Sequence, residues 1–600
     1  MGGEKRLKQR EEIENIYKWN IGEMYTDEAL WESKFLGVKA MASAFGAHAG
    51  HLGDSAEALL AAFKERDALW LKLEHLYVYA RMKQDEDNRA DRYQSLNMRA
   101  ETLMNEAAAQ SSFFTPELLS IPEKTLMDFI SEDKGLMVYE HAIKDILRQK
   151  AHVLSETEET LLAQFGEISG AAKSIFGMIN NADMKFGIIT DEDGDQVELT
   201  HGNYITFMES HNRAVRESAF RQLYNTYEKQ KNTLATTYNF NTKKNVMFAG
   251  IRRYDSALAS ALSSDNIEKE VYTSLIDSIN NHLGSIYKYV EIRKKMLGVE
   301  KTAMYDMYVP LVERPKREVP FEEALEIMYD GLAPLGDAYI ADVKRGVASG
   351  WIDVYENEGK TSGAYSFGSY NSMPYILMNY SGKLKDVFTI AHEMGHSMNS
   401  YYTRKKQPFI YGGHSIFTAE VASTVNECLL MQHLLNNCKD EREKIYLLNL
   451  YIEEFRTTVF RQTMFAEFEK MTHEAVGRGE VLTADRLCKE YGELNRKYFG
   501  PNVICDKEIE MEWSRIPHFY NAFYVYKYAT GYSAAVAISN NILNKGQYAV
   551  DAYLDFLAKG ESDYPVELLK GAGVDMGKPD VVDSAMKTFD GLVDQLEELV

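Results

Sequence analysis

The sequence His392-Glu393-Met394-Gly395-His396 combines residue types and spacing that suit metal chemistry. Residues four apart lie on the same face of a helix, so the imidazoles of His392 and His396 can reach one zinc ion. Glu393 then lies beside the metal, where a carboxylate can take a proton from the attacking water and pass it to a leaving amine. The alternative is a helix with two ordinary hydrogen-bonded histidines and a surface Glu, because such a short match also arises by chance.

A second helix can supply the third ligand that a hydrolytic zinc site needs beside its open position. In the predicted helix over residues 417–427, Glu420 interrupts an otherwise apolar and small-residue surface. A carboxylate buried there needs a metal or a cation as its partner. Glu427 lies two turns further along the same face, where it either supports a ligand histidine or faces solvent.

Together with a third motif, these segments resemble the oligoendopeptidase F family, within the larger group that contains thimet oligopeptidase and neurolysin. The third motif runs from Ile516-Pro517-His518-Phe519-Tyr520 to Tyr526-Lys527-Tyr528-Ala529-Thr530-Gly531. The similarity extends over residues 115–590, and the first hundred residues are less diagnostic.

The resemblance implies a mostly helical, elongated multi-helix body with a deep substrate channel and a small β-sheet beside the zinc site. It implies one zinc ion per chain, held by His392, His396 and Glu420, with Glu393 as the general base. It also implies short unstructured peptides as substrates, because a folded chain could not enter the channel.

The third motif contains candidate donors for the negative charge that develops on the carbonyl oxygen during peptide hydrolysis. We expect His518, which follows Ile516-Pro517 at a predicted helix start, to be one of them. Tyr524 and Tyr528, predicted to lie one helical turn apart, are the best candidates among the tyrosines. Core packing is the alternative for each tyrosine.

Substrate-binding residues are predicted at two further places. The strand-rich stretch 361–381 could pair with the backbone of an extended peptide, and Gly363 and Gly368 would permit a close approach. A small structural sheet is the alternative. His414 is predicted near the site as a substrate contact, with sequence drift as the alternative, because its loop departs from the family pattern. Asn399 departs from it as well, since many relatives carry a His there.

The rest of the chain reads as successive amphipathic helices. We predict an N-terminal helical region over 1–110, a helical subdomain over 111–200 that ends in a β-hairpin, and a catalytic domain over 201–600. The hairpin is expected around the Asp-Gly turn at 191–195. A long helix with an apolar stripe is expected over 440–474.

Charge, hydropathy and cysteine content indicate which kinds of binding partner and which cellular compartment to expect. Lys plus Arg number 67 against 90 for Asp plus Glu, a net charge of -23 that disfavours nucleic acid and anionic membranes. No apolar run approaches the roughly 18 residues of a membrane span, and the N-terminal segment lacks the pattern of a secretory signal. The 4 cysteines have no metal-site spacing. These features predict a cytoplasmic enzyme, and they give no prediction of its oligomeric state.

Two other functions are alternatives to the zinc endopeptidase. A zinc carboxypeptidase or dipeptidase on a similar helical fold would need cationic side chains that bind the substrate carboxylate. The motifs contain no cluster of Arg or Lys that would indicate such a site. A catalytically inactive peptide-binding protein would have no need for Glu393.

Overall fold

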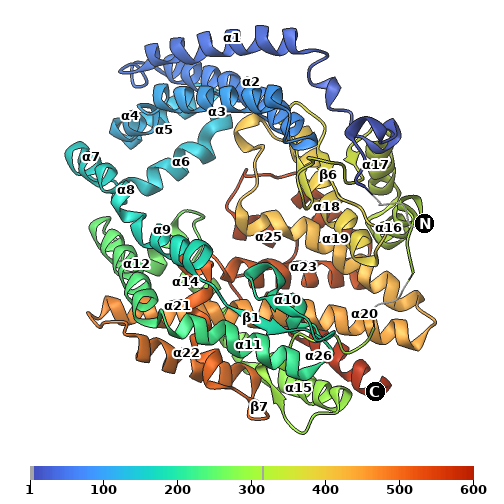
Figure 1. Cartoon of the computed structure of the whole chain (residues 1–600). Coiled ribbons are helices and arrows are strands. Elements are labelled where there is room, and N and C mark those ends of the chain that lie inside the picture. The colour runs from blue at the N-terminus through green and yellow to red at the C-terminus, as the bar shows by residue number, and fades with distance from the viewer. Residues whose placement is uncertain (1–5, 314–316) are drawn as a thin grey trace. The chain divides into compact units, whose positions relative to one another are not determined.

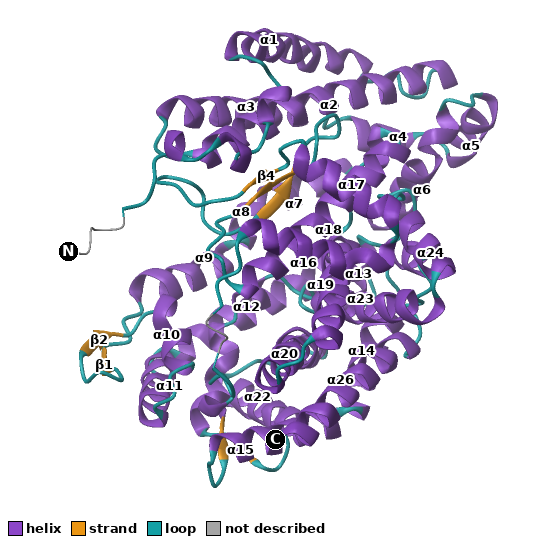
Figure 2. Ribbon diagram, turned by 90° about the vertical axis from the view of Figure 1, so that its right-hand side faces the viewer, coloured by secondary structure: helices purple, strands orange, loops and turns teal. Residues whose placement is uncertain are grey.

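The computed structural model describes residues 6–313 and 317–600, and helices make up most of it (Figure 2). Within this part of the chain the strands form three small sheets, two of two strands and one of three. The predicted mostly helical class with a small sheet is confirmed. No helix among the described residues is long and apolar enough to cross a membrane.

Contacts divide the chain into two compact units, each made of three segments that are distant in sequence. The metal motif and Glu420 belong to the first unit, whereas the His518 motif belongs to the second. The predicted divisions at residues 110 and 200 stay predictions. The first unit comprises 1–151, 317–433 and 538–573, and the second comprises 152–316, 434–537 and 574–600.

Three long helices, α1 (Glu28–Phe45), α2 (Ala56–Glu86) and α3 (Asp91–Gln110), lie side by side in the first unit (Figure 1). Helix α1 begins where the Asp27 carboxylate accepts the Leu30 N–H, a standard N-cap. Its buried residues recur every three or four positions, so one face packs into the core. Those residues are Trp31, Phe35, Val38, Ala42 and Phe45.

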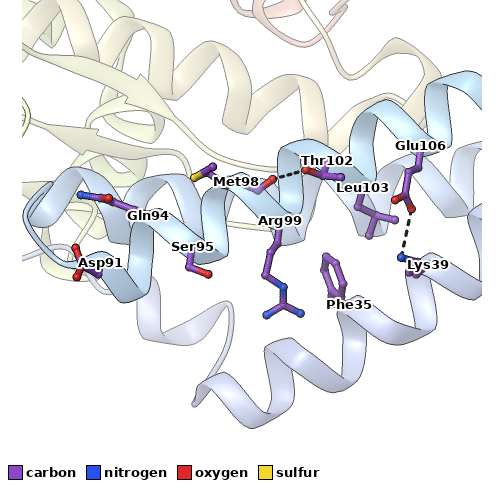
Figure 3. Close-up of a pocket in the computed structure, with 10 residues that line it drawn as sticks. All are labelled: Phe35, Lys39, Asp91, Gln94, Ser95, Met98, Arg99, Thr102, Leu103 and Glu106. Atoms are coloured by element: carbon purple, nitrogen blue, oxygen red, sulfur yellow. Dashed lines mark hydrogen bonds and ion pairs between the residues drawn. The ribbon is translucent and has the colours of Figure 1, made fainter.

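A groove of about 580 Å³ lies between α1 and α3 (Figure 3). Its two cations are paired: Lys39 lies 3.6 Å from Glu106, and Arg99 lies 2.7 Å from Glu32. The Arg99 guanidinium also lies 4.5 Å from the centre of the Phe35 ring. The groove is larger than the hollow of about 390 Å³ beside His392 and His396, but no histidine lines it.

A three-stranded sheet in the first unit borders the metal motif. Strand β6 (Tyr375–Leu377) pairs in parallel with β4 (Ile352–Asp353) and antiparallel with β5 (Tyr365–Phe367), which makes β5 an edge strand. Ser366 in β5 lies opposite Ile376. The strands predicted over 361–381 are confirmed, whereas β4, a strand of only two residues before that stretch, was not predicted.

The second unit contains the predicted hairpin, β1 (Ile188–Thr190) and β2 (Gln196–Glu198). The Asp191 carboxylate accepts the backbone N–H groups of Asp193 and Asp195, so hydrogen bonds within the turn hold its acidic residues together.

The long helix predicted over 440–474 is divided into α20 (Glu441–Glu454), a π-helical segment η11 (Phe455–Phe460) and α21 (Arg461–Gly477). Its predicted apolar stripe is buried throughout, from Ile445 to Val459. The third sheet consists of two strands of two residues each, β3 (Thr302–Ala303) and β7 (Val503–Ile504), which pair in parallel.

The remaining α-helices have the following bounds. In the first unit they are α4 (Phe114–Ser120), α5 (Glu123–Glu132), α6 (Glu140–Arg148), α16 (Phe321–Leu332), α17 (Asp337–Ala348), α18 (Leu384–Lys406), α24 (Gln547–Leu557) and α25 (Pro565–Gly571). In the second they are α7 (Glu156–Gln164), α8 (Gly166–Ser169), α9 (Ala171–Met178), α10 (His201–Met208), α11 (Arg213–Glu228), α12 (Lys231–Ile251), α13 (Ala257–Ser263), α14 (Lys269–Asn281), α15 (Leu283–Leu297), α22 (Ala484–Phe499) and α26 (Asp580–Leu599). Two helices run from one unit into the other: α19 (Ile416–Asn437) and α23 (Tyr526–Lys545).

Candidate metal centre

Helix α18 carries the metal motif, and its ends are well defined. The Asp386 carboxylate accepts the backbone N–H groups of Ser381 and Lys383 at 2.8 and 3.0 Å, which satisfies donors at the helix start. Arg404, at 2.9 Å from the Gly368 carbonyl oxygen, lies in the last turn, where a cation complements the helix dipole. The helix is thereby fixed at both ends of the motif.

Gly395 lets α18 approach α19 closely. A Cβ atom at this position would lie 2.6 Å from the Ala422 carbonyl oxygen and 2.6 Å from the Ser423 Cα, both backbone atoms. The Asn426 amide also donates to the Ala391 carbonyl oxygen at 3.0 Å, which ties the two helices together. The glycine inside the motif therefore brings the second helix within reach of the histidines.

His392, His396 and Glu420 present their ligand atoms to one point. The two Nε2 atoms lie 3.2 Å apart, and the Glu420 Oε2 lies 3.4 Å from His392 Nε2 and 3.3 Å from His396 Nε2. Ligands about 2.0 to 2.1 Å from a tetrahedral ion are separated by about 3.3 to 3.4 Å. The donor set therefore fits a tetrahedral metal that keeps a fourth position open.

The Glu420 side chain is 53% exposed, because it faces the hollow in front of the histidines. The hydrogen bond with His396 lowers the pKa of Glu420 to about 2. This carboxylate is ionised at neutral pH and ready to bind a cation.

Glu427 lies behind His392, with its Oε1 atom 3.3 Å from the Nδ1 atom of the ring. Burial opposes protonation of His392, but the hydrogen bond to Glu427 and the neighbouring carboxylates outweigh it and raise the His392 pKa to about 9. A pocket that favours an extra positive charge on its imidazole also favours a metal cation. Glu427 thus contacts the candidate ligand His392 while its side chain stays 34% exposed.

Glu393 is 7% exposed, and its burial raises the pKa of its carboxyl above the usual range. It lines a hollow of about 390 Å³ together with the three candidate ligands. The edge strand forms another wall, where the Ser366 hydroxyl lies 2.8 Å from that of Ser397 on α18. The lining residues are Ala364, Tyr365, Ser366, His392, Glu393, His396, Asn399, Ser400, His414, Ala419 and Glu420.

The predicted substrate-binding residues lie in different settings. His414 lines the hollow, with its Nε2 atom 3.0 Å from the Thr403 hydroxyl, and burial lowers its pKa to about 4, so the ring is neutral. Gly363 adopts a φ of 85° outside the hollow's lining. At Gly368 the close approach is to the protein itself, since a Cβ there would lie 2.6 Å from the Met373 carbonyl oxygen.

The third motif forms its own aromatic cluster in the second unit. The His518 ring centre lies 6.2 Å from that of Tyr524 and 6.1 Å from that of Tyr528, and the two tyrosine rings are 5.5 Å apart. Desolvation of the ring lowers the pKa of His518, although the residue as a whole is exposed. Tyr520 is 8% exposed and fits core packing.

The helix start predicted at Ile516-Pro517 is present: His518 lies in a short 3-10 helix, η13 (Pro517–Tyr520), with Pro517 at its first position. Tyr524 precedes α23, so the expected helical spacing from Tyr528 was wrong, and the loop that holds it contains Phe523 at a φ of 56°.

Sequence reasoning missed several residues that shape the metal centre. Gly395 and Asn426 hold the two helices together, and Ser366 and Ser397 join the strand to α18. The glycine inside the motif was an available signal, because a small residue on a helix permits close packing. The serine contact had no local signal.

Comparison with known proteins identifies the family. Residues 206–588 match Peptidase family M3, and residues 117–186 match Oligopeptidase F. The chain is 47% identical to Oligopeptidase PepF of Bacillus subtilis over 99% of this chain and 89% of that protein. It is 41% identical to Group B oligopeptidase PepB of Streptococcus agalactiae over 98% of each.

A solved structure gives the same result. The crystal structure of oligoendopeptidase-F from Enterococcus faecium is 38% identical, with a TM-score of 0.74 over 95% of this chain and 99% of that chain. The relatives, the matched family and the His-His-Glu donor set agree with one another. The chain therefore belongs to peptidase family M3 and is a metalloendopeptidase.

Proposed function

We propose that this chain is a zinc-dependent endopeptidase that hydrolyses internal bonds of short unstructured oligopeptides. The observation that carries the proposal is the mutual spacing of the three donor atoms, which lie 3.2, 3.3 and 3.4 Å apart. Two imidazole nitrogens and one carboxylate oxygen are the ligand types of catalytic zinc sites that keep one position open. His392, His396 and Glu420 would therefore hold one zinc ion per chain.

Bound zinc supplies a Lewis acid that polarises the substrate carbonyl and makes water more acidic. Glu393 is the general base in this proposal: it takes a proton from the attacking water and delivers it to the leaving amine. Its burial favours this role, because a carboxyl with a raised pKa holds the proton between the two steps. Glu427 orients the His392 ring through its Nδ1 atom.

His518, Tyr524 and Tyr528 are proposed to donate hydrogen bonds to the carbonyl oxygen as it becomes negatively charged. Support comes from their assembly into one cluster although they lie on different elements. Gly363, Gly368 and His414 stay proposed substrate contacts, of which His414 has the strongest support because it lines the hollow at Glu393.

The proposed substrate class follows the names of the relatives, which are oligopeptidases and oligoendopeptidases. A cytoplasmic location is also proposed, and no disulfide forms among the described residues, in agreement with a reducing compartment.

The decisive experiment measures zinc content and turnover in one preparation. We expect one zinc per chain and cleavage inside an internally quenched peptide that is blocked at both ends. Release of terminal residues from a free peptide, without cleavage of the blocked one, would favour a carboxypeptidase or dipeptidase. Full zinc content without any cleavage would favour a peptide-binding protein.

A further inference from the structure

Glu469 is a fully buried acid on α21 that the proposed reaction does not use. Its Oε1 atom accepts the backbone N–H of Phe523 at 3.0 Å. Its Oε2 atom has no hydrogen-bond partner among the described residues. Because a buried acid is costly, its presence here calls for a reason beyond packing.

The residue that Glu469 holds is conformationally unusual. Phe523 has a φ of 56°, in the left-handed region that side chains with a Cβ rarely adopt. Such a turn persists when its surroundings hold it in place. The Phe523 ring lies 4.5 Å from the His473 ring and 5.8 Å from the Tyr272 ring, and the hydrogen bond to Glu469 fixes its backbone.

The partners on α21 are themselves fixed. His473 lies with its Nδ1 atom 2.8 Å from the Glu469 carbonyl oxygen and its Nε2 atom 3.1 Å from the Asn245 amide nitrogen. The Tyr272 hydroxyl donates to the Ala466 carbonyl oxygen at 2.7 Å. Residues on one face of α21 therefore contact the Phe523 turn and hold it in place.

This turn connects the members of the aromatic cluster. On one side, the Asn521 N–H donates to the His518 carbonyl oxygen at 2.8 Å. On the other side, Tyr524 follows Phe523 directly, and its carbonyl oxygen accepts the Lys527 N–H at 3.2 Å at the start of α23. A change in the Phe523 backbone would therefore move Tyr524 relative to His518.

We propose that Glu469 is a positioning residue that holds the Phe523 turn and thereby fixes Tyr524 against His518 and Tyr528. The proposal rests on the catalytic role proposed above for this cluster. Glu469 acts through the turn and touches no substrate. A displacement of a catalytic donor by about 1 Å is enough to reduce a rate roughly 100-fold.

The test compares Glu469→Met, which fills the space but offers only the weak acceptor of a thioether sulfur, with Glu469→Gln, which keeps an acceptor oxygen. Tyr289→Phe is the control, because the Tyr289 hydroxyl also donates to a carboxylate, that of Glu453, in another part of the second unit. We expect Glu469→Met to lower kcat about 10- to 100-fold at unchanged KM and metal content. Glu469→Gln and Tyr289→Phe should keep kcat near the wild-type value.

Hydrogen exchange of the segment 519–528 reads the position of the turn without using activity. Faster exchange there in Glu469→Met, with wild-type exchange in Glu469→Gln and Tyr289→Phe, would support the proposal. Wild-type exchange or wild-type kcat in a folded, metal-replete Glu469→Met protein would overturn it.

Tyr524→Phe separates the failure of this inference from the failure of the proposed function. If Tyr524→Phe is slow but Glu469→Met is not, Glu469 has no positioning role. If Tyr524→Phe, Tyr528→Phe and His518→Ala all keep the wild-type kcat, the role of the cluster fails, whatever hydrogen exchange shows for Glu469→Met.

Discussion

Glu427 contacts the His392 ring on the side opposite to Nε2, the nitrogen that would bind the metal. The Glu427 Oε1 atom lies 3.3 Å from His392 Nδ1, while His392 Nε2 lies 3.2 Å from His396 Nε2. A hydrogen bond at Nδ1 fixes the tautomer in which Nε2 is free to bind a metal, and it makes the imidazole a better ligand. The carboxylate can therefore influence metal affinity without touching the ion.

We expect Glu427→Ala to weaken zinc binding about 10- to 100-fold, because the His392 ring loses its orienting acceptor. Glu427→Gln should lose less, since its amide oxygen can still accept the Nδ1 proton. Competition with a chromophoric chelator measures both dissociation constants. Equal zinc affinity in the wild type and Glu427→Ala would show that this contact has no role in metal binding.

His396→Ala removes one of the three proposed ligands and should abolish stoichiometric zinc binding and activity. When zinc is added to the metal-free wild type at 100 times its dissociation constant, the free energy of unfolding should rise by about 2.7 kcal/mol, and Tm should rise with it. His396→Ala should show no comparable rise. His48→Ala is a matched control, because His48 lies 2.9 Å from Glu65 on the surface of the first unit. A full equivalent of zinc in active His396→Ala would contradict the ligand assignment.

Glu393→Gln tests the general base. The amide keeps the shape of the side chain but cannot accept the proton, so we expect kcat to fall about 100-fold or more. Zinc content and Tm should stay close to those of the wild type, because the buried carboxyl gains little from its charge. Near-normal turnover in a metal-replete sample would exclude Glu393 as the base.

His518→Ala, Tyr524→Phe and Tyr528→Phe test the proposed oxyanion donors. A donor used only in the transition state contributes about 3 kcal/mol, so its loss lowers kcat roughly 100-fold with little change in KM. We expect His518→Ala and at least one tyrosine variant to behave in this way at unchanged Tm and zinc content. Tyr254→Phe, which loses a hydroxyl contact with Ser263 elsewhere in the second unit, is the control. Wild-type kcat in all three variants would reduce the third motif to core packing.

The sequence was sufficient for those features that depend on local spacing. The interval between His392 and His396 predicts a shared face, and the two histidines do face one point. The strands over 361–381 and the hairpin at 191–195 were also predictable, because turn residues and alternating side chains mark them.

Features that depend on which elements pack together were not predictable. The exposure of Glu420 depends on the hollow in front of it, and the contact between Gly395 and Ala422 depends on the approach of two helices. The left-handed turn at Phe523 had no signal, since such a φ is usually marked by Gly or Asn. The buried acid that holds this turn is 54 residues away in sequence.

The same acid gives a prediction for stability that is independent of the metal. Burial raises the pKa of Glu469 to about 8, whereas an unfolded chain has the ordinary value of 4.5. Between these values the folded state holds a proton that the unfolded state has released, so the contribution of Glu469 to the free energy of unfolding falls as pH rises from about 4.5 to 8. Among the facing groups, burial raises the pKa values of Tyr238 and Tyr272 beyond their usual range, so neither titrates in this window. Burial lowers the His473 pKa from 6.5 to about 4, so His473 makes a contribution of opposite sign up to about pH 6.5, and a comparison of two proteins that both keep His473 cancels it.

Glu469→Gln removes this proton and keeps the shape of the side chain. We therefore expect the variant to gain stability relative to the wild type as pH rises, by up to about 1.4 kcal/mol for each pH unit. The difference should be smallest near pH 5 and largest near pH 8, and urea unfolding of both proteins at each pH measures it. Tyr289→Phe serves again as the control, with a difference from the wild type that stays constant across the series. A constant difference for Glu469→Gln as well would mean that Glu469 has the same pKa in the folded and unfolded chains.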